Sequence, residues 1–259
     1  MSGSGGCNAK TPLVPAIRGV PAIRGDPAVR GVGVSRWELK DTVSIPNDGG
    51  ELRLFQRDND FAIRIAGGYG DLMNSRTHGS EDALGTLGCE TRRDKAGARI
   101  LIGGLGMGFT LAAALHCLPA DADVVVAELV PGVVQWNHDL CGGCAGHPLT
   151  DERVRVEIAD VGQLINGASA TYDAILLDVD NGPEGLTHPE NDHLYSFQGV
   201  QAAYNALRGS GVLAVWSASP EPRFISRLRK VGFSVDERRV RAHRGKGSRH
   251  IIWLATRGR

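Results

Sequence analysis

Beyond Gly97 the sequence alternates between short apolar runs and segments with helical spacing, and this alternation constrains the fold more than any other feature. The apolar runs are ARILIGG, ADVVVAEL, VRVEIAD, YDAILLDVD and GVLAVWSA, and the helical segments between them are GFTLAAALHCL, PGVVQWNHDL, VGQLI and LYSFQGVQAAYNALR. Strands that are apolar along their whole length are buried on both faces. The pattern therefore predicts an α/β, Rossmann-like fold, in which helices cover both faces of a mostly parallel sheet.

A different arrangement follows the helical segment EPRFISRLRKVG. The two β-prone runs FSVDERRVRA and SRHIIWLATR are separated only by the short basic turn HRGKG. A connection that short joins antiparallel strands, so we expect an antiparallel C-terminal hairpin at the edge of the sheet. The basic run across residues 238–249 is interpreted as its solvated face, with a role toward RNA or an acidic substrate as the alternative.

The region before Gly97 divides at two changes of composition. Residues 1–34 contain VPAIRG twice and DPAVRG once, and their repeated proline and glycine predict a flexible low-complexity tail. Residues 35–72 hold the runs WELKDTVSI, GELRLFQR and DFAIRIAG, which predict a small antiparallel β region. In residues 73–259, the ligand-binding Rossmann-like domain, MNSRTHGSEDALGTLGCETRR is predicted to form a helix that starts near Ser80 and ends in basic residues.

Composition excludes several classes of function. Lys plus Arg and Asp plus Glu are equal at 29 each, so no net charge attracts the chain to nucleic acid or to a membrane surface. No apolar run is long enough to cross a bilayer and no signal peptide begins the sequence, which predicts a soluble cytoplasmic protein. The five cysteines are expected to be reduced thiols. The small β region makes a homodimer possible.

One cysteine- and histidine-rich run resembles a metal site. In HDLCGGCAGH, His138, Cys141, Cys144 and His147 are spaced three apart. Zinc sites usually draw their second pair of ligands from a distant segment, so we predict that no metal is bound here.

In an open parallel sheet the ligand lies beyond the carboxyl ends of the strands, and the first such end carries a glycine-rich turn. The turn contains Gly103, Gly104, Gly106 and Gly108, which allow a ligand to approach the main chain closely. Its G-x-G-x-G spacing differs from the G-x-G-x-x-G pattern of dinucleotide binding. The glycines alone indicate a nucleotide-like ligand only weakly.

Acidic residues stand at the next strand ends. Glu128 follows the glycines by about twenty residues, where a carboxylate can accept both hydroxyls of a ribose. Asp160 can accept from an adenine amino group or cap the following helix. Asp178 and Asp180 point to the same face if the chain is still extended there. Carboxylates repel phosphate, whereas adenosine carrying a sulfonium suits them. The pattern therefore predicts S-adenosylmethionine or a relative of it.

These motifs resemble a known family. ILIGGLGMGFTLAAAL, VVVAELVPGVVQWN, DERVRVEIADV and YDAILLDVDNGPEGL together are similar to class I S-adenosylmethionine-dependent transferases, and within them to the spermidine-synthase-like (polyamine aminopropyltransferase-like) group. The resemblance spans about residues 37–256 and implies a class I methyltransferase fold preceded by a small β region. It implies cofactor contacts from Gly103, Gly104, Gly106, Met107, Gly108, Glu128, Asp160, Val161 and Asp178. Candidate residues on the substrate side are His78, Glu81, Asn181 and Tyr195.

The chain departs from that group at two motifs. Spermidine synthases have an aspartate at or next to the position of Met107, which selects decarboxylated S-adenosylmethionine; here the residue is uncharged. DVDNGP replaces an Asp-Ser-Ser-Asp-Pro type of run, which moves the outer acid to Asp180 or replaces it by Asn181. We therefore expect alkylation of a small-molecule amine with Asp178 as base, assisted by Asp180, with methyl transfer (EC 2.1.1) favoured over propyl-chain transfer (EC 2.5.1).

Four alternatives stay open at this point. Attack on the propyl chain would give aminopropyl or aminocarboxypropyl transfer, and attack by the donor's own amine would give cyclisation. Methylthioadenosine is the by-product in each of these cases. A nucleoside-binding protein without catalysis would bind the donor and not consume it. A nicotinamide oxidoreductase would explain the glycines and Glu128 but not Asp178.

Overall fold

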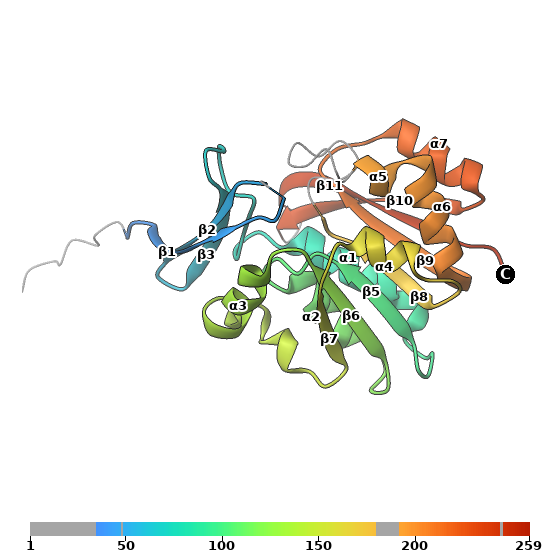
Figure 1. The fold of residues 1–259 in the computed structure, drawn as a ribbon, viewed down its shortest axis with the longest axis horizontal. Coiled ribbons are helices and arrows are strands. Elements are labelled where there is room, and N and C mark those ends of the chain that lie inside the picture. The colour runs from blue at the N-terminus through green and yellow to red at the C-terminus, as the bar shows by residue number, and fades with distance from the viewer. Residues whose placement is uncertain (1–34, 48, 180–191, 244–245) are drawn as a thin grey trace, which may run out of the picture. The chain divides into compact units, whose positions relative to one another are not determined.

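Two sheets organise the chain in a computed structural model that describes residues 35–47, 49–179, 192–243 and 246–259 (Figure 1). The larger has seven strands in the order β10-β11-β9-β8-β5-β6-β7. Pairing from β9 through β7 is parallel, whereas β11 is antiparallel to β9 and β10 is antiparallel to β11. Its strands are β5 (Arg99–Gly103), β6 (Asp123–Glu128), β7 (Val154–Ile158), β8 (Tyr172–Leu177), β9 (Leu207–Ser217), β10 (Ser234–His243) and β11 (Lys246–Thr256). The predicted mostly parallel sheet with its antiparallel hairpin is confirmed.

Helices cover both faces of this sheet, and successive strand residues point alternately into the two layers. On β5, Ile100 and Ile102 pack in one apolar core with Leu84, Leu111 and Val133 of the helices on that side. Leu101 packs in the other core, with Ile165, Val200 and Phe224. The helices of the first face are α1 (Gly79–Cys89), α2 (Phe109–Cys117) and α3 (Pro131–Asp139), and those of the second include α4 (Val161–Asn166), α6 (Phe197–Ala206) and α7 (Pro222–Val231).

Short helical turns link these elements. They are η1 (Glu90–Arg92), η2 (Gly142–Ala145), η3 (Pro148–Thr150) and the four-residue helix α5 (Asp192–Tyr195). The run predicted as one helix from residue 194 is two helices, α5 and α6, because Ser196 caps α6 by accepting a hydrogen bond from the amide of Gly199.

The smaller sheet is antiparallel, in the order β1-β2-β3-β4. Its strands are β1 (Glu38–Ser44), β2 (Glu51–Arg57), β3 (Asp60–Ile65) and β4 (Met73–Asn74). The sheet contacts α3, where Trp136 Nε1 donates to Asp41 Oδ2 at 2.7 Å and Gly132 leaves room for the side chain of Val43. Residues Ser35–Arg259 form one compact unit, so the proposed boundary at residue 72 stays a prediction.

The structure corrects the helix predicted around Ser80. Met73–Asn74 pair with β3 as a strand, and the helix begins only at Gly79. Ser80 does not cap it, because its hydroxyl bonds to the carboxyl of Glu81 instead. The expected basic end is also missing from α1 itself, and the first basic residue after it is Arg92 in η1.

Helices α1 and α2 approach each other closely at Gly85. A β-carbon there would collide with the carbonyl oxygen of Thr110 and lie 2.8 Å from the side chain of Ala113. Only glycine allows this separation without moving a helix. The contact fixes the distance between the first turns of the two helices, which carry Glu81 and Thr110.

The tail of residues 1–34 and its repeats lie outside the described residues. In the part of the chain that the structure does describe, no helix is both long enough and apolar enough to span a membrane.

Candidate active site

The glycine turn lies between the carboxyl ends of two acid-bearing strands, because β5 is flanked by β6 and β8. Gly104, Gly106 and Gly108 have φ of 87°, 52° and 85°, in the left-handed region that favours glycine. A β-carbon at Gly104 would lie 2.5 Å from the carbonyl oxygen of Asp178. The predicted loop is thus in place at the point where strand order reverses, the usual ligand crevice of such sheets.

Glu128 ends β6 and is held by backbone groups. Its Oε2 accepts from the amide of Leu105 at 2.9 Å, and its Oε1 accepts from the amide of Val130 at 2.8 Å. Burial raises the pKa of Glu128, and the backbone hydrogen bonds offset part of that rise. The amides of Gly106 and Leu129 also act on this carboxyl and help to lower its pKa. The contact of Glu128 with the hydroxyls of a ribose stays a prediction.

The predicted cofactor contact of Met107 stays a prediction. Its side chain is fully buried in the core, together with Phe109 and Leu111. The glycines on either side of it, Gly106 and Gly108, have positive φ.

Asp160 caps α4, with its Oδ1 accepting from the amide of Gly162 at 2.6 Å. The residue is exposed and its other oxygen has no hydrogen bond among the described residues, so a contact with adenine stays a prediction. Val161 is buried against Gly103, where a β-carbon would lie 2.9 Å from the valine side chain. Val161 thus supports the glycine turn.

Asp178 follows β8 and faces α1 and α2. Its amide donates to Gly103 O at 2.9 Å, and its Oδ2 accepts from Thr110 Oγ1 at 2.6 Å. Burial raises the pKa of Asp178 to about 6, although the hydrogen bond from Thr110 works in the opposite direction. A carboxyl poised near neutrality is suited to accept a proton from an amine.

A second acid lies beside Asp178. Burial raises the pKa of Glu81 to about 7, and the negative charge of Asp178 adds to this rise. Ser80 Oγ donates to Glu81 Oε2 at 2.6 Å, and His250 Nδ1 lies 2.9 Å from the same Oγ. The structure thus brings together a carboxyl pair from α1 and the end of β8, with polar support from α2 and β11.

Aromatic rings border this carboxyl pair. His78, immediately before α1, stacks on Phe109 with ring centroids 4.0 Å apart and an interplanar angle of 9°. Trp216 meets His250 edge to face at 4.8 Å, and its buried Nε1 has no acceptor among the described residues. Tyr195 is buried and donates to Val179 O at 3.2 Å. Asp180 and Asn181 lie outside the described residues.

Three functional candidates were not predicted from sequence: Thr110, Ser80 as a partner of Glu81, and His250. Thr110 lies just after the glycines on α2, a position that could have signalled a contact with the crevice. His250 is 170 residues from Ser80, and nothing in its surrounding sequence marks it. Such a pairing depends on the antiparallel hairpin that brings β11 to the same sheet edge.

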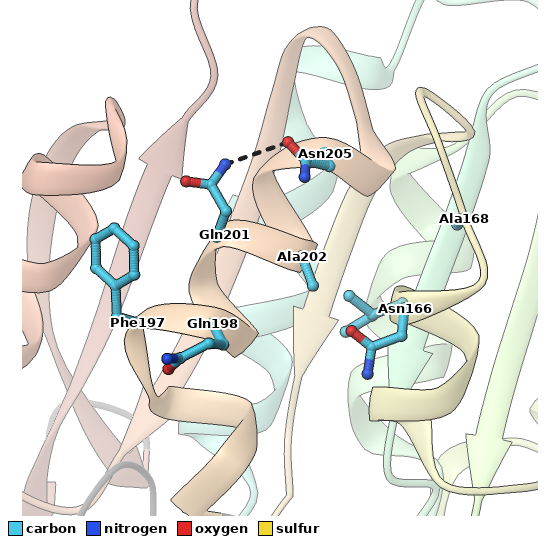
Figure 2. Close-up of a pocket in the computed structure, with 8 residues that line it drawn as sticks. Asn166, Ala168, Phe197, Gln198, Gln201, Ala202 and Asn205 are labelled. Carbon is cyan, nitrogen blue, oxygen red and sulfur yellow. Dashed lines mark hydrogen bonds between the residues drawn. The ribbon is translucent and has the colours of Figure 1, made fainter.

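A separate groove of about 350 Å³ lies between α4 and α6 (Figure 2). Its lining is amide and apolar, with Gln201 Nε2 donating to Asn205 Oδ1 at 3.2 Å. None of the lining side chains is titratable. The groove therefore offers no group for proton transfer, and the acids described above define the candidate site.

The run His138, Cys141, Cys144 and His147 does not assemble into a metal site in the structure. Cys141 is buried and Cys144 half-buried. Among the described residues, no group of three or more histidine, cysteine, aspartate or glutamate side chains is arranged to hold a metal ion.

The parallel sheet, the glycine turn after β5 and the acid ending β6 define a class I methyltransferase-like α/β fold. No protein-family model matches the sequence, and no curated protein sequence matches it. Solved structures are more informative: the chain has a spermidine-synthase-like fold.

Three similar structures support this assignment. A spermidine synthase in complex with the transition-state analogue AdoDATO has a TM-score of 0.66 at 16% identity, over 85% of this chain and 72% of that one. The spermidine synthase from Thermotoga maritima gives 0.63 at 16% identity, over 85% and 72%. A probable spermidine synthase from Corynebacterium glutamicum gives 0.57 at 14% identity, over 86% and 80%. The predicted family resemblance is confirmed at the level of the fold.

Proposed function

We propose that the protein transfers an aminopropyl group from decarboxylated S-adenosylmethionine to a small-molecule amine, with Asp178 as the proton acceptor. The observation that carries this proposal is the placement of Glu128 and Asp178 on either side of the glycine turn, in a spermidine-synthase-like fold. A neighbouring structure is described as a complex with a transition-state analogue of spermidine synthase, and this supports the choice of donor.

The residues of the crevice fit an adenosyl sulfonium. Glu128 places a carboxyl beside the glycine turn, where it can meet the hydroxyls of a ribose, and the turn provides main chain without side chains for the donor's tail. When bound, the donor supplies a carbon activated by its positively charged sulfur. Carboxylates at the crevice stabilise positive charge, so Glu128, Asp178 and Glu81 favour this ligand over a pyrophosphate.

Asp178 has the position and the pKa for its role. An amine reaches the site as an ammonium ion and attacks only after losing a proton. With a pKa raised to about 6 by burial, the carboxyl of Asp178 is ionised above neutral pH and still basic enough to accept that proton. Thr110 orients the carboxyl through the hydrogen bond to Oδ2.

Methyl transfer from intact S-adenosylmethionine is the second candidate. One observation favours it: residues 104–108 contain no acidic side chain to repel the donor's carboxylate. The acids at the amine end make transfer from the decarboxylated donor the stronger proposal.

The by-product decides between the two. We would incubate the protein with 1,4-diaminobutane and either donor, then identify the nucleoside by mass spectrometry. Methylthioadenosine from the decarboxylated donor is expected. Adenosylhomocysteine would replace the proposal with methyl transfer, and consumption of neither donor would contradict both.

A binding measurement isolates the donor end. Glu128→Gln should weaken binding of methylthioadenosine by about 10- to 100-fold, because it replaces an ionised acceptor of hydroxyl groups by a neutral one. Glu157→Gln is the matched control, since Glu157 lies on β7 and pairs with Arg155. Equal affinity in the two variants would contradict the assignment of Glu128 to the ribose.

A further inference from the structure

The carboxyl pair of Glu81 and Asp178 lacks a positive partner among the described residues. None of the ion pairs formed by lysine or arginine there includes either carboxyl. The charge of His78 acts to lower the pKa of Glu81, but His78 Nδ1 lies 2.8 Å from Asp82 Oδ2 and pairs with that carboxyl when it is protonated. Thr110 Oγ1 lies 3.3 Å from the carbonyl oxygen of Glu81 and 2.6 Å from Asp178 Oδ2, so one hydroxyl links the two residues. Ionisation of one half-buried carboxyl opposes ionisation of the other, so the pair favours a proton or a positively charged ligand.

Among the described residues, the other elements packed around α1 do not supply that charge. On α2, Thr110 and Phe109 present a hydroxyl and a ring. On β10, the groups next to Gly79 are the backbone carbonyls of Arg241 and Ala242. On β11, burial lowers the pKa of His250, so this ring is neutral at neutral pH. The cation expected at this site therefore comes from outside the described part of the chain.

We propose that Glu81 and Asp178 form a two-carboxyl amine site that holds one shared proton in the free protein, and that Ser80 and His250 position Glu81. The acceptor's ammonium group binds in place of that proton. This inference rests on the proposed function, and it moves the second acid of the amine site from the loop after β8 to α1. Glu81 then acts with Asp178 in binding the acceptor and in accepting its proton.

The proton inventory of the step balances. Binding of the ammonium ion releases the shared proton to solvent and leaves two carboxylates around one cation. One of the carboxylates then takes a proton from the ammonium nitrogen, which frees a lone pair. That lone pair forms the new carbon–nitrogen bond as the carbon–sulfur bond breaks, and its electrons go to sulfur, which leaves as a neutral thioether. The product nitrogen carries the positive charge.

Ser80 and His250 are suited to follow this change of protonation. When Glu81 is ionised, Ser80 Oγ donates to Oε2 and accepts from His250 Nδ1. When Glu81 is protonated, the hydrogen bonds can reverse, with the carboxyl donating to Ser80 and Ser80 donating to the neutral ring. Ser80 is fully buried and Trp216 packs against the ring of His250, so the chain stays aligned in both states.

The first test uses the free protein. Carboxyl carbon NMR of protein labelled at the Asp and Glu side chains would follow the titration of Glu81 and Asp178, assigned with Glu81→Gln and Asp178→Asn. We expect the two carboxyls to lose their last proton near neutral pH, and Asp178→Asn to lower the pKa of Glu81. Full ionisation of both groups below pH 5 would overturn the inference.

The second test measures protons released on binding. Calorimetric titration with 1,4-diaminobutane in buffers of different ionisation enthalpy, in the presence of methylthioadenosine, should show release of part of a proton near pH 6. Glu81→Gln should abolish this release and weaken binding by about 10- to 100-fold. Glu90→Gln, at an exposed position just after α1, is the matched control and should behave as the unaltered protein. Unchanged release in Glu81→Gln would overturn the inference.

Separate measurements of nucleoside binding and diamine binding distinguish failure of this inference from failure of the proposed function. Failure of methylthioadenosine to bind would contradict the proposed donor site, whereas normal nucleoside binding with no binding of the diamine would overturn the amine site. Ser80→Ala tests positioning: loss of its hydrogen bond should raise the pKa of Glu81 further, because that bond acts to lower it. A variant that loses only thermal stability, with the pKa of Glu81 unchanged, would reduce Ser80 to a packing residue.

Discussion

An aspartate lies near each end of strand β8, and the surroundings of the two shift their pKa values in opposite directions. At the amino end, fully buried Asp173 accepts from Lys95, from Arg208 Nη1 at 2.8 Å and from the amide of Arg99 at 2.9 Å. Burial acts to raise the pKa of Asp173, but these partners together lower it below its ordinary value. At the carboxyl end, Asp178 has a hydroxyl partner and a neighbouring acid, and its pKa is raised.

The difference teaches that burial alone does not set the charge of an acid. Two positive side chains and an amide make Asp173 a permanent anion that ties α1's trailing loop, β5 and β9 together. Asp178 has no such partners among the described residues, so its charge responds to pH and to a ligand. The first acid serves stability, and the second is free to serve chemistry.

The largest expected effect is the loss of turnover in Asp178→Asn. Without a proton acceptor, turnover of the diamine should fall by about 10²- to 10⁴-fold. Stability in the absence of ligand should be equal or higher, because a repulsive charge is removed. The measurement is methylthioadenosine formation beside a thermal melt, and nearly normal turnover would contradict the role of Asp178.

Asp173→Asn should lower the stability of the fold. We expect a loss of about 2–3 kcal/mol of unfolding free energy, because Lys95 and Arg208 lose their buried anion. Denaturant titration at pH 7 measures this. Affinity for methylthioadenosine at low temperature should be unchanged. A loss of binding without a loss of stability would contradict the structural role of Asp173.

The pH dependence of stability sharpens the contrast. The pKa of Glu81 is raised from its ordinary value of 4.5 to about 7. The stability that Glu81 contributes is therefore complete below pH 4.5 and is lost as pH rises through 7. Asp173, with its lowered pKa, contributes stability that is present above its ordinary value of 3.8 and is lost in acid. Denaturation curves from pH 3 to 9 should show both trends.

Glu81→Gln removes the first of these trends selectively. The variant should be more stable than the unaltered protein at pH 8 by about 1–3 kcal/mol, and equally stable near pH 4.5. Glu90→Gln should follow the unaltered protein throughout. A destabilised Glu81→Gln at pH 8 would mean that Glu81 is held as an anion.

Thr110→Val should give the smallest effect. The hydroxyl lowers the pKa of Asp178, so its loss should raise that pKa by about half a unit to one unit. The acidic limb of the pH–rate profile should move upward accordingly, with little change in the rate at high pH. If the acidic limb of the pH–rate profile does not move, the limb reports the titration of a group other than Asp178.

Much of the fold could be predicted, because apolar runs without alternation specify buried parallel strands and the short basic turn specifies a hairpin. The positions of Glu128 and Asp178 at strand ends also followed from this pattern. The burial of the Met107 side chain could not be predicted, since it depends on how the glycine turn packs against the core. The joining of His250 to Ser80 could not be predicted either, because it depends on strand pairing between segments far apart in sequence.

The missing side chain at Gly85 has a consequence for how such a site can change. Because α1 and α2 touch there through backbone, the spacing of Glu81 and Thr110 is set by the absence of a single methyl group. Substituting alanine would push the helices apart and change the spacing of Glu81 and Thr110 while leaving each polar group intact. One apolar position can thus alter the geometry of this site without altering its chemical groups.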